Sequence, residues 1–279
     1  MSVTATPQRR ARTRGPDRHG VAVGLPFWLW IPAGIGFALI ALPVVGLIVR
    51  ADLVRLPELV TSVSALAALE LSLRTAATST VLCLLFGGPL AAVLARSSFP
   101  GLALVRPLVL LPLVLPPVVG GLALLYTLGR TGFAGQLLEL WTGFTVPFTT
   151  VAVVLAQTFV SMPFLVVSLE GALRTAGERY ETVAATLGAS PSVVFRRITL
   201  PLVLPGLASG LVLAFARAMG EFGATIAFAG SLQGTTRTLP LLVYQERESD
   251  VDGAIALSLI LVVVAVIVIA VARPRAVAQ

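Results

Sequence analysis

The chain has 279 residues, of which 57% are hydrophobic and only 12% are charged. Soluble domains carry roughly 25% charged residues, so this composition excludes an ordinary soluble protein and indicates a membrane protein. The net charge of +7 does not point to nucleic acid, because the arginines lie in tails and loops between apolar stretches.

Six stretches without any charged residue follow one another along the chain. They range from 19 residues (198–216) to 30 residues (20–49), and about 20 apolar residues suffice to cross the hydrocarbon core. Backbone groups in lipid cannot bond to water, so helices are the expected form. We therefore predict an all-α integral membrane protein with six transmembrane helices, at Gly20–Val49, Thr75–Ala95, Pro107–Gly129, Leu140–Leu169, Ile198–Ala216 and Gly253–Ala272.

The arginines are distributed unevenly between the two sides of this predicted bundle. The loops at 50–58 and 246–252 balance their arginines with acids, whereas the loops on the other side carry an excess of arginine. Because positively charged loops stay in the cytoplasm, we expect both termini and the loop at 170–200 to be cytoplasmic. Thirteen of the twenty arginines then lie on that side: Arg9, Arg10, Arg12, Arg14, Arg18, Arg96, Arg106, Arg174, Arg179, Arg196, Arg197, Arg273 and Arg275.

The polar residues offer no catalytic or metal-binding constellation. Cys83 is the only cysteine, and His19, the only histidine, lies in the basic tail. The chain has no lysine, so it lacks the Walker A motif, whose lysine reaches the terminal phosphates of ATP. The 30-residue first stretch exceeds the roughly 7–15-residue apolar core of a signal peptide, so we expect it to remain as a span. We expect no catalytic residue, metal ligand or bound cofactor here.

The loop at 170–200 has the pattern of two short helices. Thr175-x-x-Glu178 is a capping box, which predicts a helix start near Ala176. Gly188 stands where a helix-ending glycine is expected, and Ser190-Pro191 predicts a second start. The first helix would present one apolar stripe that fits a groove on a partner protein, formed by Tyr180, Val183, Ala184 and Leu187. A solvated loop between spans is the alternative.

The end of this loop resembles the "EAA" loop of bacterial ABC importer permeases. Gly188 is followed by nine residues and then by Ile198-x-Leu200-Pro201. The chain departs from the motif where Thr182 and Val183 replace its glutamate and first alanine, with Glu181 one position early. The resemblance implies a type I ABC importer permease architecture, with cytoplasmic coupling helices between spans 4 and 5. It implies that Glu181, Ala184, Gly188, Phe195, Ile198, Leu200 and Pro201 couple the chain to a separate ATPase subunit, which uses ATP and Mg.

Two further segments narrow the resemblance. Residues 107–121 are similar to the third-span signature of oxyanion importers, and residues 215–225 are similar to sulfate and molybdate permeases. Residues 226–231 and 237–241 resemble the molybdate (ModB-type) branch in particular.

This resemblance covers roughly residues 66–271 and implies a domain plan. We expect a basic tail at 1–20, a first transmembrane helix and outer loop at 21–65, the importer transmembrane domain at 66–272 and a C-terminal tail at 273–279. It also implies a place in the bilayer of the bacterial cytoplasmic membrane and an extracytoplasmic oxyanion-binding protein as partner. Because six spans are few to enclose a pathway, we expect a homodimer around a two-fold axis.

Two features inside the spans are candidates for the translocation pathway. Pro112, Pro116 and Pro117 remove backbone donors from the third stretch, which is tolerated where irregular backbone lines a wet cavity or is buried. Arg217 and Glu221 are expected at i and i+4 on one helix face, either lining the pathway or forming a structural ion pair. The candidate set is Pro112, Pro116, Pro117, Arg217, Glu221, Gly223 and Thr225.

The expected function is therefore that of a permease subunit for molybdate in an ATP-driven importer. Tungstate or sulfate/thiosulfate are alternative substrates within the same family. An ion-coupled secondary transporter is an alternative of another class, but it would normally carry ionisable residues in several spans and an inverted repeat.

Overall fold

The structure is a computed structural model that describes residues 26–272 of the chain. Within this range it consists of helices and their connections, without any strand. The tails predicted at 1–20 and 273–279 lie outside the described residues. The helices are α1 (Trp30–Arg50), α2 (Leu56–Val60), α3 (Val63–Leu82), α4 (Gly88–Arg96), α5 (Leu102–Val114), α6 (Pro117–Leu128), α7 (Phe133–Thr142), α8 (Thr150–Ala176), α9 (Arg179–Thr186), α10 (Pro191–Val194), α11 (Leu200–Met219), α12 (Gly223–Ala229), α13 (Leu239–Ser249) and α14 (Val251–Ala272).

Three short helical pieces complete this order. A 3₁₀ turn, η1 (Phe27–Leu29), precedes α1. Two π-helical turns, η2 (Cys83–Gly87) and η3 (Phe195–Thr199), join α3 to α4 and α10 to α11. The joined helices continue through these turns, so that Val63–Arg96 and Pro191–Met219 each form one long apolar crossing.

The predicted all-helical class is confirmed, and the six predicted stretches correspond to five or six candidate spans. Five helices are long and apolar enough to cross a membrane, and one bent pair supplies a sixth crossing if it counts as one span. The crossings are Phe27–Arg50, Val63–Arg96, Leu102–Val114 with Pro117–Leu128, Thr150–Ala176, Pro191–Met219 and Val251–Ala270. Each overlaps one of the charge-free stretches.

The chain divides into two compact units, residues 1–46 and 47–279. The described part of the first unit is η1 and most of α1, none of whose residues is buried within this chain. Trp30, Phe37 and Ile40 expose their large apolar side chains. A helix that is apolar and exposed all round has to be covered by lipid or by another subunit.

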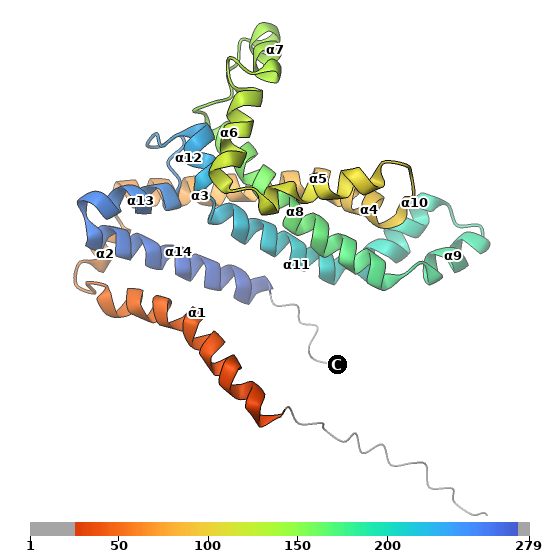
Figure 1. Cartoon of the computed structure of the whole chain (residues 1–279), viewed down its shortest axis with the longest axis horizontal. Coiled ribbons are helices and arrows are strands. Elements are labelled where there is room, and N and C mark those ends of the chain that lie inside the picture. The colour runs from red at the N-terminus through yellow and green to blue at the C-terminus, as the bar shows by residue number, and fades with distance from the viewer. Residues whose placement is uncertain (1–25, 273–279) are drawn as a thin grey trace, which may run out of the picture. The chain divides into compact units, whose positions relative to one another are not determined.

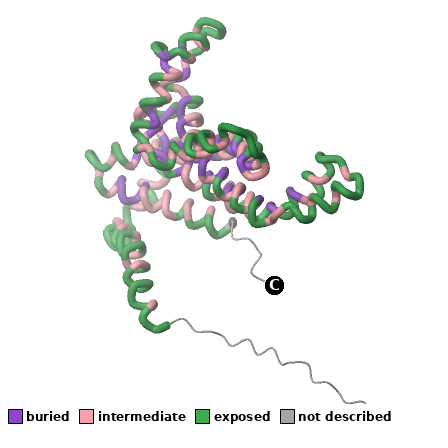
Figure 2. The backbone as a smooth tube through the Cα atoms, turned by 45° about the vertical axis from the view of Figure 1, so that its right-hand side comes forward, coloured by how far each residue is buried: buried purple, intermediate pink, exposed green. Residues whose placement is uncertain are grey.

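The second unit is organised around α8, which packs along α11 (Figure 1). In Figure 2 the buried segments gather in the interior of this unit, whereas the α9 and α10 region is largely exposed. Small buried residues take part in the packing of these helices: Ala76 of α3 packs with Ala218 of α11, and Ala214 of α11 packs with Leu165 of α8. Small side chains let helix backbones approach closely, which is how helices associate in membranes.

Hydroxyl groups add hydrogen bonds to this packing. Ser72 Oγ on α3 accepts the backbone N–H of Leu239 at 2.7 Å, which fixes the start of α13. Thr158 Oγ1 on α8 donates to Ser79 Oγ on α3 at 3.2 Å. All three hydroxyl-bearing side chains are buried, where an unpaired polar group would be costly.

The third span is broken rather than merely kinked. Helices α5 and α6 meet at 117° across a short break. Pro116 is the N-cap of α6 and Pro117 its first residue, the position where a missing N–H costs nothing. Pro112, also expected to disturb the helix, lies inside α5, which continues to Val114. The break is therefore made by the Pro116-Pro117 pair, and Pro112 does not contribute to it.

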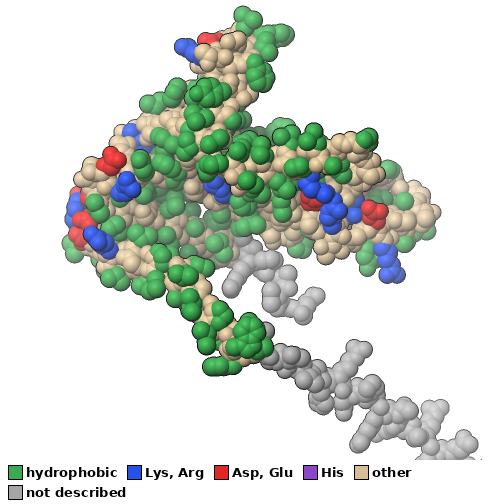
Figure 3. Space-filling view, viewed as in Figure 1, with side chains coloured by type: hydrophobic (Ala, Val, Ile, Leu, Met, Phe, Trp, Pro, Cys, Tyr) green, Lys and Arg blue, Asp and Glu red, His purple; other side chains and the backbone are tan. Residues whose placement is uncertain are grey.

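Charged side chains gather at two ends of the second unit and at the tip with α7, with mostly hydrophobic side chains between these places (Figure 3). At one end, Arg55 lies 3.7 Å from Asp250 and 3.6 Å from Asp252, so the two predicted acid-balanced loops meet. At the other end, Arg96 and Arg106 pair with Glu181 and Glu170. The loops predicted to share one side of the membrane thus lie together.

Candidate functional site

The predicted coupling loop forms a short helix, α9, that is set off from α8 by a two-residue turn. The capping-box prediction is wrong: Thr175 and Ala176 form the end of α8, and α9 begins at Arg179. Gly177 has φ +67°, so it ends α8 in a backbone conformation that L residues rarely adopt. Helix α8 continues through the polar residues after Leu169 and ends at Ala176. The Thr175-x-x-Glu178 pattern therefore covers the end of α8 and the following turn, and not the start of a new helix.

The end of α9 is the glycine cap that the sequence predicted. Gly188 has φ +84°, and its N–H bonds to the Ala185 carbonyl at 3.0 Å. The next residue, Ala189, donates to the Ala184 carbonyl at 3.1 Å, which completes a Schellman motif. Ser190 is the N-cap of α10, with Pro191 at its first position, as expected.

The predicted apolar stripe lines one wall of a groove. Tyr180, Val183 and Leu187 are exposed, and Ala184 lies between them. The opposite wall comes from the junction of η3 and α11, where Ile198 and Pro201 take part. The groove has a volume of about 610 Å³ and is lined by Tyr180, Val183, Ala184, Leu187, Arg197, Ile198, Pro201 and Leu202. The groove therefore combines the stripe with three of the seven predicted coupling-loop positions, Ala184, Ile198 and Pro201.

Phe195 and Leu200, two other predicted coupling residues, face a different surface. Both line an apolar pocket of about 410 Å³ against α4, α8 and α11. Phe195 also borders a groove on the other side of α9, next to Glu178 and Glu181. They lie at the root of the loop, where it joins the fifth span, rather than along the exposed stripe.

Glu181 points into the protein and not toward the groove. Its Oε1 accepts hydrogen bonds from Arg96 Nη2 at 3.0 Å and from Thr199 Oγ1 at 2.8 Å. Only 24% of the Glu181 side chain is exposed. The Glu181 carboxylate is therefore engaged within the chain, and its role in coupling to the ATPase stays a prediction.

A second ion cluster lies beside the first. Glu170 Oε1 accepts from Arg106 Nη2 at 2.6 Å and from Arg174 Nε at 2.9 Å. Both arginines also donate to the Leu94 carbonyl near the end of α4, at 3.2 and 3.0 Å. Cations at the C-terminal end of a helix complement its dipole. This cluster joins α4, α5 and α8.

The predicted intramembrane pair exists, but not on one helix face. Arg217 lies in α11, which ends at Met219, and Glu221 follows that end. The two side chains meet at 2.7 Å between Nη1 and Oε2, with Glu221 buried. Glu221 Oε1 also accepts the N–H of Ala224 at 2.7 Å, which satisfies a free donor in the first turn of α12. Glu221 thus links the end of one helix to the start of the next.

Helix α12 packs against α6, so the broken third span meets the segment after Glu221. A Cβ on Gly223 would lie 2.8 Å from Pro117 Cβ, and one on Gly121 would lie 2.6 Å from the Ala224 carbonyl oxygen. Glycine is required at both positions for this close approach. The predicted pathway residues Pro117, Gly223 and Glu221 are therefore brought together, whereas Pro112 belongs to α5.

Thr225 Oγ1 is buried without a hydrogen-bond partner among the described residues. Thr225 was among the predicted pathway residues.

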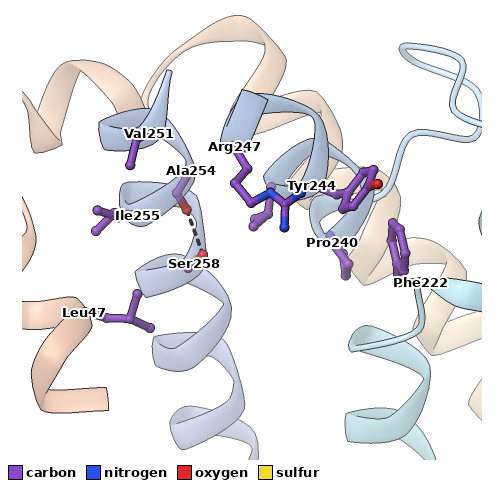
Figure 4. A pocket seen from close by; sticks show the side chains of 10 residues that line it. Leu47, Phe222, Pro240, Tyr244, Arg247, Val251, Ala254, Ile255 and Ser258 are labelled. Atoms are coloured by element: carbon purple, nitrogen blue, oxygen red, sulfur yellow. Dashed lines mark hydrogen bonds between the residues drawn. The ribbon is translucent and has the colours of Figure 1, made fainter. Parts of the chain in front are cut away.

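A pocket next to this site was not predicted from the sequence. It has a volume of about 400 Å³ and lies between α13, α14 and Phe222 (Figure 4). The ring centroids of Phe222 and Tyr244 are 4.9 Å apart, and the Cζ atom of Arg247 lies 5.2 Å from the Tyr244 ring centroid. From the sequence Arg247 is placed in an acid-balanced loop, but it lies in helix α13, where Tyr244 and Arg247 are three residues apart and therefore neighbours on the helix surface.

Comparison with known proteins identifies relatives over most of the chain. Residues 87–276 match the family model described as binding-protein-dependent transport system inner membrane component. The molybdenum transport system permease protein ModB of Mycobacterium tuberculosis is 60% identical over 231 residues, which are 83% of this chain and 87% of that protein. ModB of Escherichia coli K12 is 46% identical over 177 residues, 63% of this chain and 77% of that protein.

A solved structure supports the fold. A bacterial alginate ABC transporter in complex with its alginate pentasaccharide-bound periplasmic protein matches with a TM-score of 0.68. The match covers 88% of this chain and 91% of that chain, at 18% sequence identity. At that identity the likeness concerns the fold, which is that of an ABC importer permease.

Proposed function

We propose that this chain forms the transmembrane pathway of an ATP-driven molybdate importer, starting from the fact that it belongs to the family of binding-protein-dependent transport system inner membrane components. The observation that supports molybdate as the substrate is the 60% identity to a molybdenum permease over 83% of the chain. The fold and the candidate spans support the role of a membrane-spanning subunit. Tungstate and sulfate or thiosulfate are the competing substrates.

Energetics explain why such a chain needs a motor. An anion of charge −2 entering an inside-negative cell climbs about 2.3 kcal/mol per charge per 100 mV, or roughly 4–5 kcal/mol in all. Since the chain has no lysine for a Walker A loop, a separate ATPase subunit supplies that energy from ATP and Mg. The exposed stripe on α9, with the groove of Tyr180, Leu187 and Ile198, is the surface we assign to the ATPase.

The remaining partners follow from the same assignment. An extracytoplasmic oxyanion-binding protein delivers the substrate, and two copies of this chain enclose the pathway around a two-fold axis. The arginine bias places the α9 loop and both termini in the cytoplasm of a bacterial cell. The acid-balanced end with Arg55, Asp250 and Asp252 then faces outward.

The pathway itself is assigned to the broken third span and the segment after α11. Irregular backbone at membrane depth is expected only where it is buried or lines a wet cavity. Pro116, Pro117, Gly223 and Thr225 lie at this place, and the Arg217–Glu221 pair stabilises it. In this arrangement the Arg217 side chain contributes to the wall of the pathway, and its positive charge is paired with the Glu221 carboxylate.

The proposal is tested by uptake in a bacterial strain in which this chain is the sole molybdate permease. We expect saturable accumulation of radiolabelled molybdate that is lost when the ATPase subunit cannot hydrolyse ATP. Competition by a tenfold excess of tungstate or sulfate ranks the substrates. Stronger competition by sulfate than by unlabelled molybdate would reassign the substrate.

A second arm separates the importer from an ion-coupled transporter. Proteoliposomes that contain the complete transporter should take up molybdate with internal ATP and without an ion gradient. Uptake driven by a proton or sodium gradient in the absence of ATP would contradict the proposal.

A further inference from the structure

One arginine connects the end of the second span to the coupling loop. Arg96 is the last residue of α4, and its Nη2 donates to the Gly177 carbonyl at 2.8 Å and to Glu181 Oε1 at 3.0 Å. Its Nη1 lies 3.6 Å from Glu178 Oε1. A single guanidinium thus holds both the turn before α9 and the first turn of α9. Arginine suits this position, because its planar donors serve several acceptors at once.

The carboxylate of Glu181 extends this contact to the fifth span. Its Oε1 also accepts from Thr199 Oγ1, at 2.8 Å. Thr199 is the last residue of the π turn η3 and is buried, immediately before α11 begins. Single π turns within helices often occur at functional sites. Arg96, Glu181 and Thr199 therefore join the second span, the coupling helix and the fifth span at one point.

The opposite end of α9 is not held in this way. A Cβ on Gly188 would meet no atom within 4 Å among the described residues, and Leu187 is exposed. The side-chain bonds that join α9 to the second and fifth spans thus lie at its N-terminal turn, while its C-terminal end carries the exposed Leu187 of the stripe and continues into α10. A short helix whose first turn is bonded to two spans is expected to follow any change in the relative position of those spans.

We propose that the Arg96–Glu181–Thr199 contact is a positioning device that transmits movement between spans two and five and the ATPase-docking helix α9. This inference rests on the proposed function. It assigns Arg96 and Glu181 to coupling within the chain and leaves contact with the ATPase to the apolar stripe. Loss of either residue should let α9 move independently of the spans while the transporter remains assembled.

The test uses the complete transporter purified with its ATPase, as the variants Arg96→Gln, Glu181→Gln and the double variant. Hydrogen exchange at the amides of residues 179–189 should become faster in both single variants. The stimulation of ATP hydrolysis by the substrate-loaded binding protein should fall roughly 3-fold to 30-fold, the range found when coupling between sites is modulated. The double variant should be no worse than the worse single variant, because the two residues act through one contact.

A matched control removes another Arg–Glu pair. Arg74 and Glu70 form an exposed ion pair at 2.6 Å on α3, so Arg74→Gln and Glu70→Gln make the same chemical changes away from α9. They should leave exchange at 179–189 and the stimulation ratio unchanged. Arg96→Lys keeps the charge next to Glu181 and should restore part of the stimulation lost in Arg96→Gln.

The outcomes separate this inference from the proposed function. Hydrogen exchange does not depend on which oxyanion is carried, so unchanged exchange in Arg96→Gln and Glu181→Gln overturns the positioning device even if molybdate is the substrate. Faster exchange with an unchanged stimulation ratio overturns its role in coupling. Additive losses in the double variant, or equal losses in the Arg74 and Glu70 controls, also count against it. A different substrate leaves the exchange result intact.

Discussion

Arg217 and Glu221 form an ion pair of 2.7 Å across the end of α11, and the two side chains differ in their access to solvent. The Arg217 side chain is 25% exposed, whereas that of Glu221 is 1% exposed. Removing the arginine would therefore leave a carboxylate without compensation in the interior. Removing the glutamate would leave a guanidinium that retains part of its access to the surroundings.

This asymmetry predicts the order of stabilities of three variants. Arg217→Gln should destabilise the protein by about 3–5 kcal/mol, the cost of breaking a buried pair on one side. Glu221→Gln should cost less, although Ala224 loses a charged acceptor for its N–H. The double variant Arg217→Gln/Glu221→Gln should regain much of the loss, because no unpaired charge remains. Thermal unfolding of the purified proteins measures all three.

Uptake by the same variants distinguishes a structural pair from a substrate contact. If the pair is structural, uptake follows the amount of folded protein. A normal melting temperature for Arg217→Gln together with abolished uptake would assign the arginine to the passing anion and reject the pair as its main role.

The close contact of α6 with α12 predicts that Gly121 tolerates no larger side chain. In Gly121→Ala the new Cβ would lie 2.6 Å from the Ala224 carbonyl oxygen, a backbone atom that cannot swing away. We expect a loss of about 1–3 kcal/mol, as for other overpacked sites, measured by thermal unfolding of the purified transporter.

Gly171 supplies the control for this substitution. It lies inside α8, and a Cβ there would meet no atom within 4 Å among the described residues. Gly171→Ala should therefore be neutral or stabilising by about 0.5–1 kcal/mol, since alanine is the better helix former. Equal losses at both glycines would contradict the role given to the α6–α12 contact.

The features that could be predicted from the sequence are those determined by near neighbours in the chain. The spans follow from long apolar runs, because lipid admits helices whatever their partners. The cap at Gly188 and the start at Pro191 follow from backbone preferences of two residues. These predictions needed no knowledge of tertiary contacts.

The sequence predictions failed where the structure depends on contacts between residues that are far apart in the chain. Arg96 and Glu181 are 85 positions apart, and no local pattern announces their contact. The capping-box pattern at Thr175 failed because the packed membrane helix α8 continues to Ala176 and ends only at Gly177. The sequence groups Pro112 with Pro116 and Pro117, but in the structure Pro116 is the N-cap of α6 and Pro117 its first residue, whereas Pro112 lies inside α5; a pathway role for Pro112 stays a prediction.

The orientation of the chain remains a prediction from its arginines. A reporter enzyme inserted within residues 175–191, or fused after Gln279, should report the cytoplasm, and one within 245–252 should report the outer side. Paired reporters that require opposite environments provide the measurement and check each other. Activity of the outer-side reporter at 175–191 would reverse the orientation and remove the coupling assignment of α9.

The backbone of Gly188 provides a final prediction, which concerns the C-terminal end of α9. Its φ of +84° is unfavourable for a β-branched residue, and no described atom lies within 4 Å of where a Cβ would be. Gly188→Val should therefore act through backbone strain alone, at about 1–2 kcal/mol. Asparagine tolerates the left-handed conformation, so Gly188→Asn should retain more of the cap.

Because the cap fixes how Leu187 is presented at the end of the stripe, the strain should appear as weakened docking rather than as loss of the membrane bundle. We expect Gly188→Val to reduce both uptake and co-purification of the ATPase subunit, with Gly188→Asn closer to the unmodified protein and melting of the bundle similar in both. If Gly188→Val and Gly188→Asn co-purify with the ATPase equally and transport equally, the left-handed cap has no part in coupling.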